Sequence, residues 1–417
     1  MKTKSPLRVC LDARLISGVN GGVEQFVIGL ASGLANLADG DEEYLFLCYQ
    51  DADEWLSPYM QGRCSPLHCG PAPRANLKQW LKPLLPAASM VVSWLGQAAV
   101  RIQVSDGVIE QASANLMHFT TQSGFLTGIP SIYQPWDLQH LHLPEFFSRR
   151  ERIVREKHYR GLCAQAKMVA VASTWTKKDV ITHYRLPHEK ICVIPTAPPN
   201  ATYPIPNSSE LELAKKKLGL PEAYIFYPAQ TWPHKNHIKL LDAIAMLRNR
   251  EGLRLALICS GKRNDFFPKI EQHIRKLSLM EQVKFLGFVT PIELQCLYRL
   301  SCGMVFPTKF EGCGLPLMEA FLTGTPVACS NVTSLPAQAG NAALIFDPDK
   351  PEEIAEALRS LWTDPTLRSA LIERGQQRVA QFTWEKTARI FRAHYRRLSD
   401  RPLQDEDRSL LEAPPII

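Results

Sequence analysis

Short apolar runs alternate with longer segments of helical periodicity along most of this 417-residue chain. An apolar run at 7–16 leads into a glycine-rich turn at 17–22, and apolar side chains then recur every three or four positions across 23–38. A second apolar run follows at 43–49. This order of strand, glycine-rich loop, helix and strand is typical of a parallel α/β sheet. Further strands of the first half are predicted at 114–119, 130–134, 167–173 and 190–195.

The same alternation restarts after a linker that follows Pro195, where proline, asparagine and serine are concentrated. Pro316 near the start of one helical segment and Gly324 just past its end are typical helix-boundary residues. We therefore predict a second open α/β domain, with its cleft at the carboxyl ends of the strands. Its strands are expected at 223–229, 253–261, 283–289, 303–308, 325–330 and 342–348.

Length, charge and cysteine content narrow the class of protein. A chain of 417 residues is too long for one ordinary core and suggests two domains of roughly 200 residues each. The net charge of +7 fits a protein that meets phosphates or an anionic membrane, although a solvated basic surface is equally compatible. The sequence has no stretch that interleaves basic and aromatic residues in the pattern of a nucleic-acid-binding module, so it does not favour nucleic acid as a partner. Eleven cysteines without a C-x-x-C pair, and no apolar signal region, favour a cytoplasmic location.

Two segments bear on membrane association. Residues 83–100 carry no charge, but their prolines, serines, glutamine and glycine favour a buried or interfacial helix over a spanning one. Residues 147–160 contain six Lys/Arg against two Glu. Together they predict peripheral docking on an anionic membrane surface, and a solvated helix face is the alternative for the basic segment.

The stretch EGCGLPLME at 311–319 places two glutamates eight residues apart around a glycine-framed loop. Its surroundings, FPTKFEGCGLPLMEAFLTGTPVACSNVTSLP, resemble the signature of retaining GT-B glycosyltransferases of family 4, with Cys313 in place of the usual aromatic residue. The resemblance covers 220–385 well and the first domain loosely. Supporting stretches are NGG at 20–22, AQTWPHKNH at 229–237, FLGFV at 285–289 and ALIFDPDKPEEIAEAL at 343–358.

This resemblance implies an α/β GT-B fold of two Rossmann-like domains that face each other across a cleft. It implies an acceptor-side domain at 1–197, a nucleotide-sugar domain at 198–383 and a helix at 384–398 that packs back toward the first domain, and we expect a flexible tail at 399–417. The activity implied is retaining hexosyl transfer from a nucleoside-diphosphate sugar to a glycan or lipid-linked acceptor. Mannose from GDP-mannose is the expected donor, because 136–147 resembles stretches of bacterial polysaccharide mannosyltransferases.

Each role in the donor site has a physical reason and a plainer alternative. Backbone N–H groups at 313–315 head a predicted helix and suit a diphosphate, and Lys235 can neutralise it. Glu319 can accept ribose hydroxyls and Glu311 sugar hydroxyls. In the plainer alternative, Glu319 is a charge near a helix N-terminus, Glu311 is a solvated loop charge and Lys235 is an ordinary surface lysine. The catalytic candidates are Glu311 and Lys235, and the donor-binding candidates are Gly21, Gly22, Gln230, Cys313, Gly314, Leu315 and Glu319.

The chain departs from the family pattern at three places. Trp136, followed by Asp137, stands where the family often has a histidine. Gln230 or His234 stands near the missing arginine of the family's G-R…K element, and Ala337 replaces a usual glutamate. The acceptor-side candidates are therefore His118, Trp136, Asp137 and His140.

No metal or cofactor beyond the donor substrate is expected. His140 and His142 are two residues apart but lack a carboxylate and third ligand at a typical spacing. The resemblance likewise implies a metal-independent enzyme. The alternatives that remain are a GT-B epimerase or phosphorylase, and a sugar-nucleotide-binding subunit that has lost catalysis.

Overall fold

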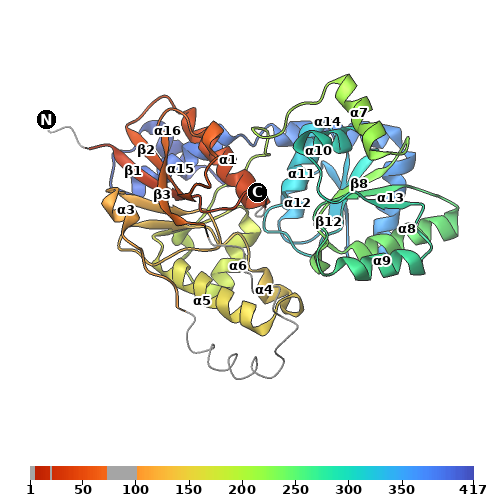
Figure 1. Cartoon of the computed structure of the whole chain (residues 1–417), viewed down its shortest axis with the longest axis horizontal. Helices are drawn as coiled ribbons and strands as arrows, with labels where there is room; N and C mark the ends of the chain where they lie inside the picture. Colours follow the sequence, from red (N-terminus) through yellow and green to blue (C-terminus); the bar gives the residue numbers. More distant parts are fainter. Residues whose placement is uncertain (1–4, 19–20, 73–100) are drawn as a thin grey trace. The chain divides into compact units, whose positions relative to one another are not determined.

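The computed structural model describes residues 5–18, 21–72 and 101–417, and it divides the chain into two compact α/β units (Figure 1). Unit 1 contains the described residues up to Ala172, together with Lys177–Ile194 and Trp384–Ile416. Unit 2 contains Ser173–Thr176, Pro195–Thr383 and Ile417. The predicted α/β class is confirmed.

Unit 1 is built on a parallel sheet with seven strands among the described residues, in the order β3-β2-β1-β4-β5-β6-β7. The sequence pattern missed β3, which contains Pro66, Gly70 and Pro71. Proline and glycine weaken a strand signal, but an edge strand tolerates them because one side needs no ladder hydrogen bonds. The strands are β1 (Leu7–Asp12), β2 (Glu42–Gln50), β3 (Cys64–Pro71), β4 (Leu116–Phe119), β5 (Ser131–Tyr133), β6 (Met168–Val171) and β7 (Ile191–Val193).

Capping chemistry defines the start of α5 (Arg149–Gln165), the longest of the described helices of unit 1. Ser148 accepts a hydrogen bond from the Glu151 N–H, and the Glu151 side chain accepts one from Ser148 in return. This capping box satisfies N–H groups that the first turn leaves unpaired. The described α-helices in the first half of the chain are α1 (Gly22–Ala35), α3 (Val108–Gln111), α4 (Gln139–His142), α5 (Arg149–Gln165) and α6 (Thr174–Tyr184).

Unit 2 has a parallel sheet in the order β10-β9-β8-β11-β12-β13. Helices α8 and α9 lie on one side of it and α10 and α11 on the other, as the reversal of strand order at β8 requires (Figure 1). Its strands are β8 (Ile225–Pro228), β9 (Leu257–Ser260), β10 (Val283–Phe285), β11 (Gly303–Phe306), β12 (Val327–Ser330) and β13 (Ala343–Phe346). Its helices are α7 (Ser208–Leu218), α8 (His237–Glu251), α9 (Phe267–Lys276), α10 (Pro291–Leu300), α11 (Leu315–Thr323), α12 (Leu335–Ala339), α13 (Pro351–Thr363) and α14 (Pro365–Val379).

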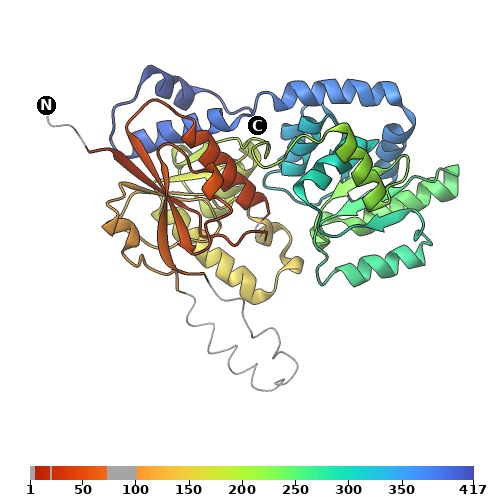
Figure 2. The same ribbon diagram turned by 45° about the horizontal axis from the view of Figure 1, so that its top comes forward.

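Helix α15 (Trp384–Leu398) returns to unit 1 and lies against α1 (Figure 2). Two glycines of α1 make this approach close. A Cβ on Gly29 would lie 1.9 Å from Cε2 of Trp384, and one on Gly33 would lie 2.4 Å from the Trp384 carbonyl oxygen. Glycine is normally unfavourable inside a helix, so these two positions exchange helix propensity for close packing of α15.

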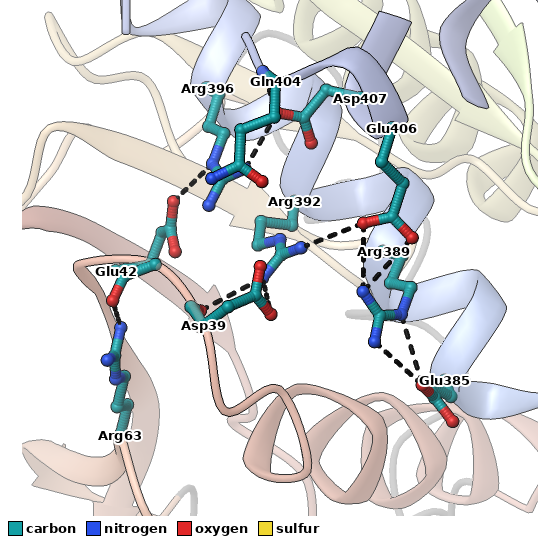
Figure 3. Close-up of polar contacts among 11 residues, drawn as sticks. Asp39, Glu42, Arg63, Glu385, Arg389, Arg392, Arg396, Gln404, Glu406 and Asp407 are labelled. Carbon is teal, nitrogen blue, oxygen red and sulfur yellow. Dashed lines mark hydrogen bonds and ion pairs between the residues drawn. The ribbon is translucent and has the colours of Figure 1, made fainter. Parts of the chain in front are cut away.

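Buried arginines fasten α15 to the start of β2 and to the loop before it (Figure 3). Arg392 pairs with Asp39 at 2.9 Å, and Arg396 pairs with Glu42 at 2.6 Å and with Asp407 at 2.8 Å. The arginine side chains are only 1% and 5% exposed. Burial alone would lower the pKa of Arg396, but its hydrogen bonds to the two carboxylates outweigh burial and raise it.

The expectation of a loose tail beyond Ser399 is wrong for the segment around α16 (Asp405–Glu412). Asp407 is 1% exposed and forms the ion pair with Arg396, and the Gln404 N–H donates to Asp407. The sequence composition is polar there because its charges are used in pairing. A polar composition does not by itself predict disorder when buried partners of opposite charge are available.

We expect Arg396→Met to destabilise unit 1 by about 3–5 kcal/mol, because Glu42 and Asp407 would remain buried without their cation. Arg408→Met is the matched control: Arg408 pairs with Asp405 at the surface, and its loss should cost about 0–1 kcal/mol. Urea unfolding, with hydrogen exchange of α15 and α16, measures both variants. Equal and small losses would show that the buried pairs do not hold α15 in place.

Candidate functional site

The two catalytic candidates follow neighbouring strands of unit 2. Lys235 ends the short 3₁₀ turn Pro233–Lys235 after β8, and Glu311 lies in the loop between β11 and α11. Strands β8 and β11 are adjacent and parallel, so their carboxyl ends meet at the same edge of the sheet. The sheet topology therefore brings together two residues that are 76 positions apart.

Lys235 and Glu311 form an ion pair in which both side chains are largely buried, at 17% and 11% exposure. The lysine Nζ also lies 5.5 Å from the centre of the Phe306 ring. Thr333 fixes the glutamate backbone, since its hydroxyl accepts from the Glu311 N–H at 3.1 Å and lies 2.7 Å from the Glu311 carbonyl oxygen. Asn236 donates from Nδ2 to the carbonyl oxygens of Pro307 and Pro348. Hydrogen bonds to backbone groups therefore hold both the loop that carries Lys235 and the loop that carries Glu311 in place.

Glu319 lies within α11 and is 7% exposed. The Tyr298 hydroxyl donates to its Oε2 at 2.6 Å, and the Tyr203 hydroxyl donates to its Oε1 at 3.4 Å. Burial raises the pKa of the Glu319 carboxyl, and the two tyrosine hydrogen bonds oppose this only in part. The sequence reasoning missed both tyrosines, because they lie in other segments and match no local motif.

In the loop between Glu311 and Glu319, two of the backbone N–H groups expected to bind a diphosphate already donate to acceptors within the protein. The Gly314 N–H donates to Oε1 of Gln338 at 2.9 Å, and the Leu315 N–H donates to the Cys313 carbonyl oxygen at 3.0 Å. A Cβ on Gly314 would lie 2.6 Å from Leu335, so glycine is needed there for packing. Within the described part of the chain, the Gly312 and Cys313 N–H groups have no protein acceptor.

The Cys313 side chain is not positioned as a reactive thiol. Its sulfur lies 2.9 Å from the Thr196 hydroxyl and accepts from Nε2 of Gln338 at 3.6 Å. Burial raises the pKa of this thiol to about 11. A neutral thiol with two polar neighbours fills the place that an aromatic residue takes in the family signature.

The residues near the missing arginine lie at the carboxyl end of β8. Gln230 accepts a hydrogen bond from Nε1 of Trp232 at 3.0 Å. Burial lowers the pKa of His234 to about 2, so its imidazole is neutral. The His234 carbonyl oxygen accepts from the Lys309 N–H at 2.7 Å, which ties this loop to the one that carries Glu311.

Two of the acceptor-side candidates have structural partners inside unit 1. His118 is fully buried on β4, between Oε1 of Gln134 at 2.9 Å and the Tyr395 hydroxyl at 2.8 Å, and burial lowers its pKa to about 3. His140 is 1% exposed and pairs with Glu156 at 2.9 Å. These contacts give both histidines a role in the core.

The other two lie just past the carboxyl end of β5. Trp136 has a positive φ of 67° and donates from Nε1 to the Thr120 carbonyl oxygen at 2.8 Å. Its ring meets Phe26 edge-on, with 4.8 Å between ring centres. Asp137 accepts from the Gln139 N–H at 3.0 Å, at the start of α4. The indole is therefore oriented by the fold, in a backbone conformation that is uncommon for a bulky residue.

The glycine candidates of unit 1 lie at the start of α1. Gly21 has φ of 49° and immediately precedes the helix, and Gly22 is its first residue. A Cβ on Gly21 would meet no atom within 4 Å, so the backbone conformation and not crowding favours glycine there. Asn20 of the same NGG stretch lies outside the described residues.

None of the helices in the described ranges is long and apolar enough to cross a membrane. The uncharged segment 83–100, for which an interfacial helix was expected, lies outside those ranges.

Because Glu319 is buried, we predict that its contribution to the free energy of unfolding depends on pH. Because burial raises its folded-state pKa, the carboxyl contributes fully to stability below its unfolded pKa, and that contribution is lost as pH rises through the folded pKa. Glu319→Gln keeps the shape and cannot ionise. Its stability relative to the unmodified protein should therefore rise from pH of about 4 toward neutrality.

Unfolding free energies measured across that pH range check this expectation. Glu222→Gln is the control, because the Glu222 side chain is 94% exposed. A stability difference for Glu319→Gln that stays flat with pH would contradict the argument.

Two family models cover most of the chain. The model described as Glycosyltransferase Family 4 matches residues 20–197, and that of Glycosyl transferases group 1 matches 209–378. Among curated relatives, the O-antigen chain mannosyltransferase B of Escherichia coli is 28% identical over 249 residues, which are 60% of this chain and 65% of the relative. The D-inositol 3-phosphate glycosyltransferase of Corynebacterium glutamicum (strain R) is 28% identical over 247 residues, 56% of this chain and 59% of the relative. The matches thus span less than two thirds of these relatives.

Solved structures agree on the fold. HepE of Anabaena, crystallised with UDP and glucose, superposes with a TM-score of 0.68 at 19% identity, covering 93% of this chain and 99% of HepE. WaaG, a glycosyltransferase involved in lipopolysaccharide biosynthesis, gives a TM-score of 0.64 at 15% identity, covering 94% of this chain and 99% of WaaG. These neighbours show the GT-B fold. With both family models matched in chain order, and the Glu-x7-Glu loop at the carboxyl edge of the second sheet, the chain belongs to glycosyltransferase family 4.

Proposed function

We propose that this protein transfers a hexose from a nucleoside-diphosphate sugar to a glycan or lipid-linked acceptor, with retention of configuration. The observation that carries the proposal is the Lys235–Glu311 pair, followed by the buried Glu319, at the carboxyl edge of the unit 2 sheet. Ligands of open α/β sheets bind at this edge.

Each residue of this site has a role that its surroundings support. Lys235 neutralises the diphosphate as charge develops on the leaving group. The Gly312 and Cys313 N–H groups, rather than those of Gly314 and Leu315, are available to the phosphate oxygens. Glu319, held between two tyrosine hydroxyls, accepts the ribose hydroxyls.

The ion pair gives Glu311 two successive partners. Without donor, Glu311 neutralises Lys235. When a diphosphate binds, it competes for the lysine, and the Glu311 carboxylate becomes free to accept hydroxyls of the transferring sugar. In the transfer, the bond from the anomeric carbon to the phosphate oxygen breaks, and the acceptor oxygen bonds to the same face of the sugar. The acceptor proton passes to the departing phosphate oxygen.

Mannose from GDP-mannose is the proposed donor. Its support is the mannosyltransferases among the relatives, which are O-antigen chain mannosyltransferases of Escherichia coli and Salmonella typhimurium and the serotype-specific mannosyltransferase WbdA of Escherichia coli, at 26–29% identity. One HepE structure that shares the fold contains UDP and glucose, and another contains UDP-glucose. The choice between guanine and uracil nucleotides is therefore the first question for experiment.

Glu319→Ala and Glu311→Ala should differ in kind. Glu319→Ala removes ribose contacts and should weaken GDP binding by about 1.5–3 kcal/mol, roughly ten- to a hundredfold. Glu311→Ala should leave GDP affinity unchanged or higher, because Lys235 loses a competing carboxylate, and should lower kcat. Calorimetric titration with GDP and UDP, and transfer assays with GDP-mannose and UDP-glucose, measure these effects.

Glu222→Ala, at an exposed position of unit 2, is the control variant for both assays. Equal, small effects of the two site variants would sink the assigned roles. Preferential binding of UDP and transfer from UDP-glucose would leave the transferase standing and overturn the mannose donor.

We further propose that unit 1 docks on the inner, anionic face of a membrane through α5, as a peripheral cytoplasmic protein. A groove of about 740 Å³ runs along this helix. Ile153 in the groove is 39% exposed, which adds an apolar contact among the cations. Its basic lining consists of Arg149, Arg152, Lys157 and Arg160.

Charge reversal at Arg149 and Lys157 should abolish co-sedimentation with vesicles of phosphatidylserine and phosphatidylcholine, since each basic residue near such a surface contributes about 1 kcal/mol. The matched control reverses Arg275 and Lys276 on α9 of unit 2, which are also exposed. Equal sedimentation of the unmodified protein with anionic and neutral vesicles would rule the docking out.

A further inference from the structure

Three side chains of metal-binding type meet in unit 1, outside the candidate donor site of unit 2. His142 is the last residue of α4, and Asp179 and His183 lie one turn apart on α6. One potential ligand atom from each lies within 4.8 Å of the others. We propose that His142, Asp179 and His183 form a binding site for a divalent transition metal of the zinc class.

The distances suit a small tetrahedral ion. Nε2 of His142 lies 2.7 Å from Oδ1 of Asp179, and Nε2 of His183 lies 3.3 Å from the same oxygen. An ion with bonds of about 2.0–2.1 Å holds its ligand atoms about 3.3 Å apart, which is close to both histidine–carboxylate distances. The histidine nitrogens lie within 4.8 Å of each other, so the ion would draw the two imidazoles together. The two imidazole rings are nearly perpendicular, with 5.4 Å between their centres.

A second observation concerns the carboxylate itself. The Asp179 side chain is 5% exposed, and its Oδ2 is buried without a hydrogen-bond partner among the described residues. A buried acceptor left without a partner costs about 1–3 kcal/mol, and more for a charged group. A bound cation would offset that cost. The His142 hydrogen bond and the His183 ion pair both go to Oδ1 and leave Oδ2 without a partner.

The carboxylate that pairs with the neighbouring His140 has partners for both of its oxygens. Glu156 accepts from His140 at 2.9 Å and from the Tyr184 hydroxyl at 3.0 Å on Oε1, and from Arg160 at 2.7 Å on Oε2. His140 and His142 are two residues apart in the sequence, but in the structure His140 contacts Glu156 and His142 contacts Asp179. The third ligand, His183, is 41 positions beyond His142 and could not be found from local spacing.

The ligand set indicates which ions would bind and what they would do. Two imidazoles and one carboxylate suit zinc, cobalt or nickel, whereas magnesium and calcium prefer oxygen ligands. The imidazoles are 31% and 37% exposed, which leaves room for water as a fourth ligand. The ion would fasten α4, a single four-residue turn, to α6.

The test uses full-length, tag-free protein stripped with a chelator. Co²⁺ is titrated in the visible spectrum and Zn²⁺ by calorimetry, with a thermal-unfolding scan in the presence and absence of Zn²⁺. We expect one ion per chain, a rise in melting temperature with Zn²⁺, and a loss of affinity of tenfold or more in His183→Gln and in His142→Gln. Both histidines are part-exposed, so these variants should fold.

His68→Gln is the matched control, since His68 and Asp53 form another histidine–aspartate pair in unit 1, 3.3 Å apart, with no third ligand among the residues that the structure describes. It should bind Zn²⁺ as the unmodified protein does. Failure of the folded, unmodified protein to bind Co²⁺ or Zn²⁺ would overturn the site. Equal affinity in His183→Gln and the unmodified protein would also overturn it. The outcome does not depend on the proposed transferase activity.

Discussion

The return of α15 to unit 1 rests on charges buried between the two ends of the chain. Arg396 lies between Glu42 at the start of β2 and Asp407 on α16, and Arg392 reaches Asp39 (Figure 3). Such charges cost desolvation, which opposite charges held close to them offset. The pairing fixes α15 against β2 and makes Trp384–Ile416 part of the first unit, although Pro195–Thr383 of unit 2 precede this segment in the sequence.

The candidate site in unit 2 also contains buried charged groups whose desolvation is offset by neighbouring side chains. Glu319 is buried deeply enough that its ionised form is disfavoured, and two tyrosine hydroxyls offset this only in part. Glu311 and Lys235 neutralise each other. Buried titratable groups with a shifted pKa, such as Glu319, are common at functional sites.

Unit 1 shows how a residue can resemble a site residue and still belong to the core. His118 was a candidate because it is one of the histidines nearest to Trp136, which stands where the family often has a histidine. It lies on β4 between Gln134 and Tyr395, and burial lowers its pKa, which favours the neutral form. Tyr395 comes from the far end of the chain, which no local pattern could bring to β4. Cys313 and Gly314 are likewise explained by contacts with Thr196, Gln338 and Leu335 that lie outside the motif.

The sequence by itself determined the α/β class, most strands and the Glu-x7-Glu loop, because apolar periodicity and glycine–proline placement are local properties of the chain. It missed the edge strand β3, whose prolines and glycine weaken its pattern, and it treated the segment around α16 as loose. Only the tertiary structure decided that Lys235 pairs with Glu311, that Tyr298 and Tyr203 hold Glu319, and that His183 joins His142 at Asp179. Apart from Asp179 and His183, which are one turn apart on α6, these contacts join residues that share no local spacing. The order of strands in the sheet, or the packing of one helix on another, brings them within reach.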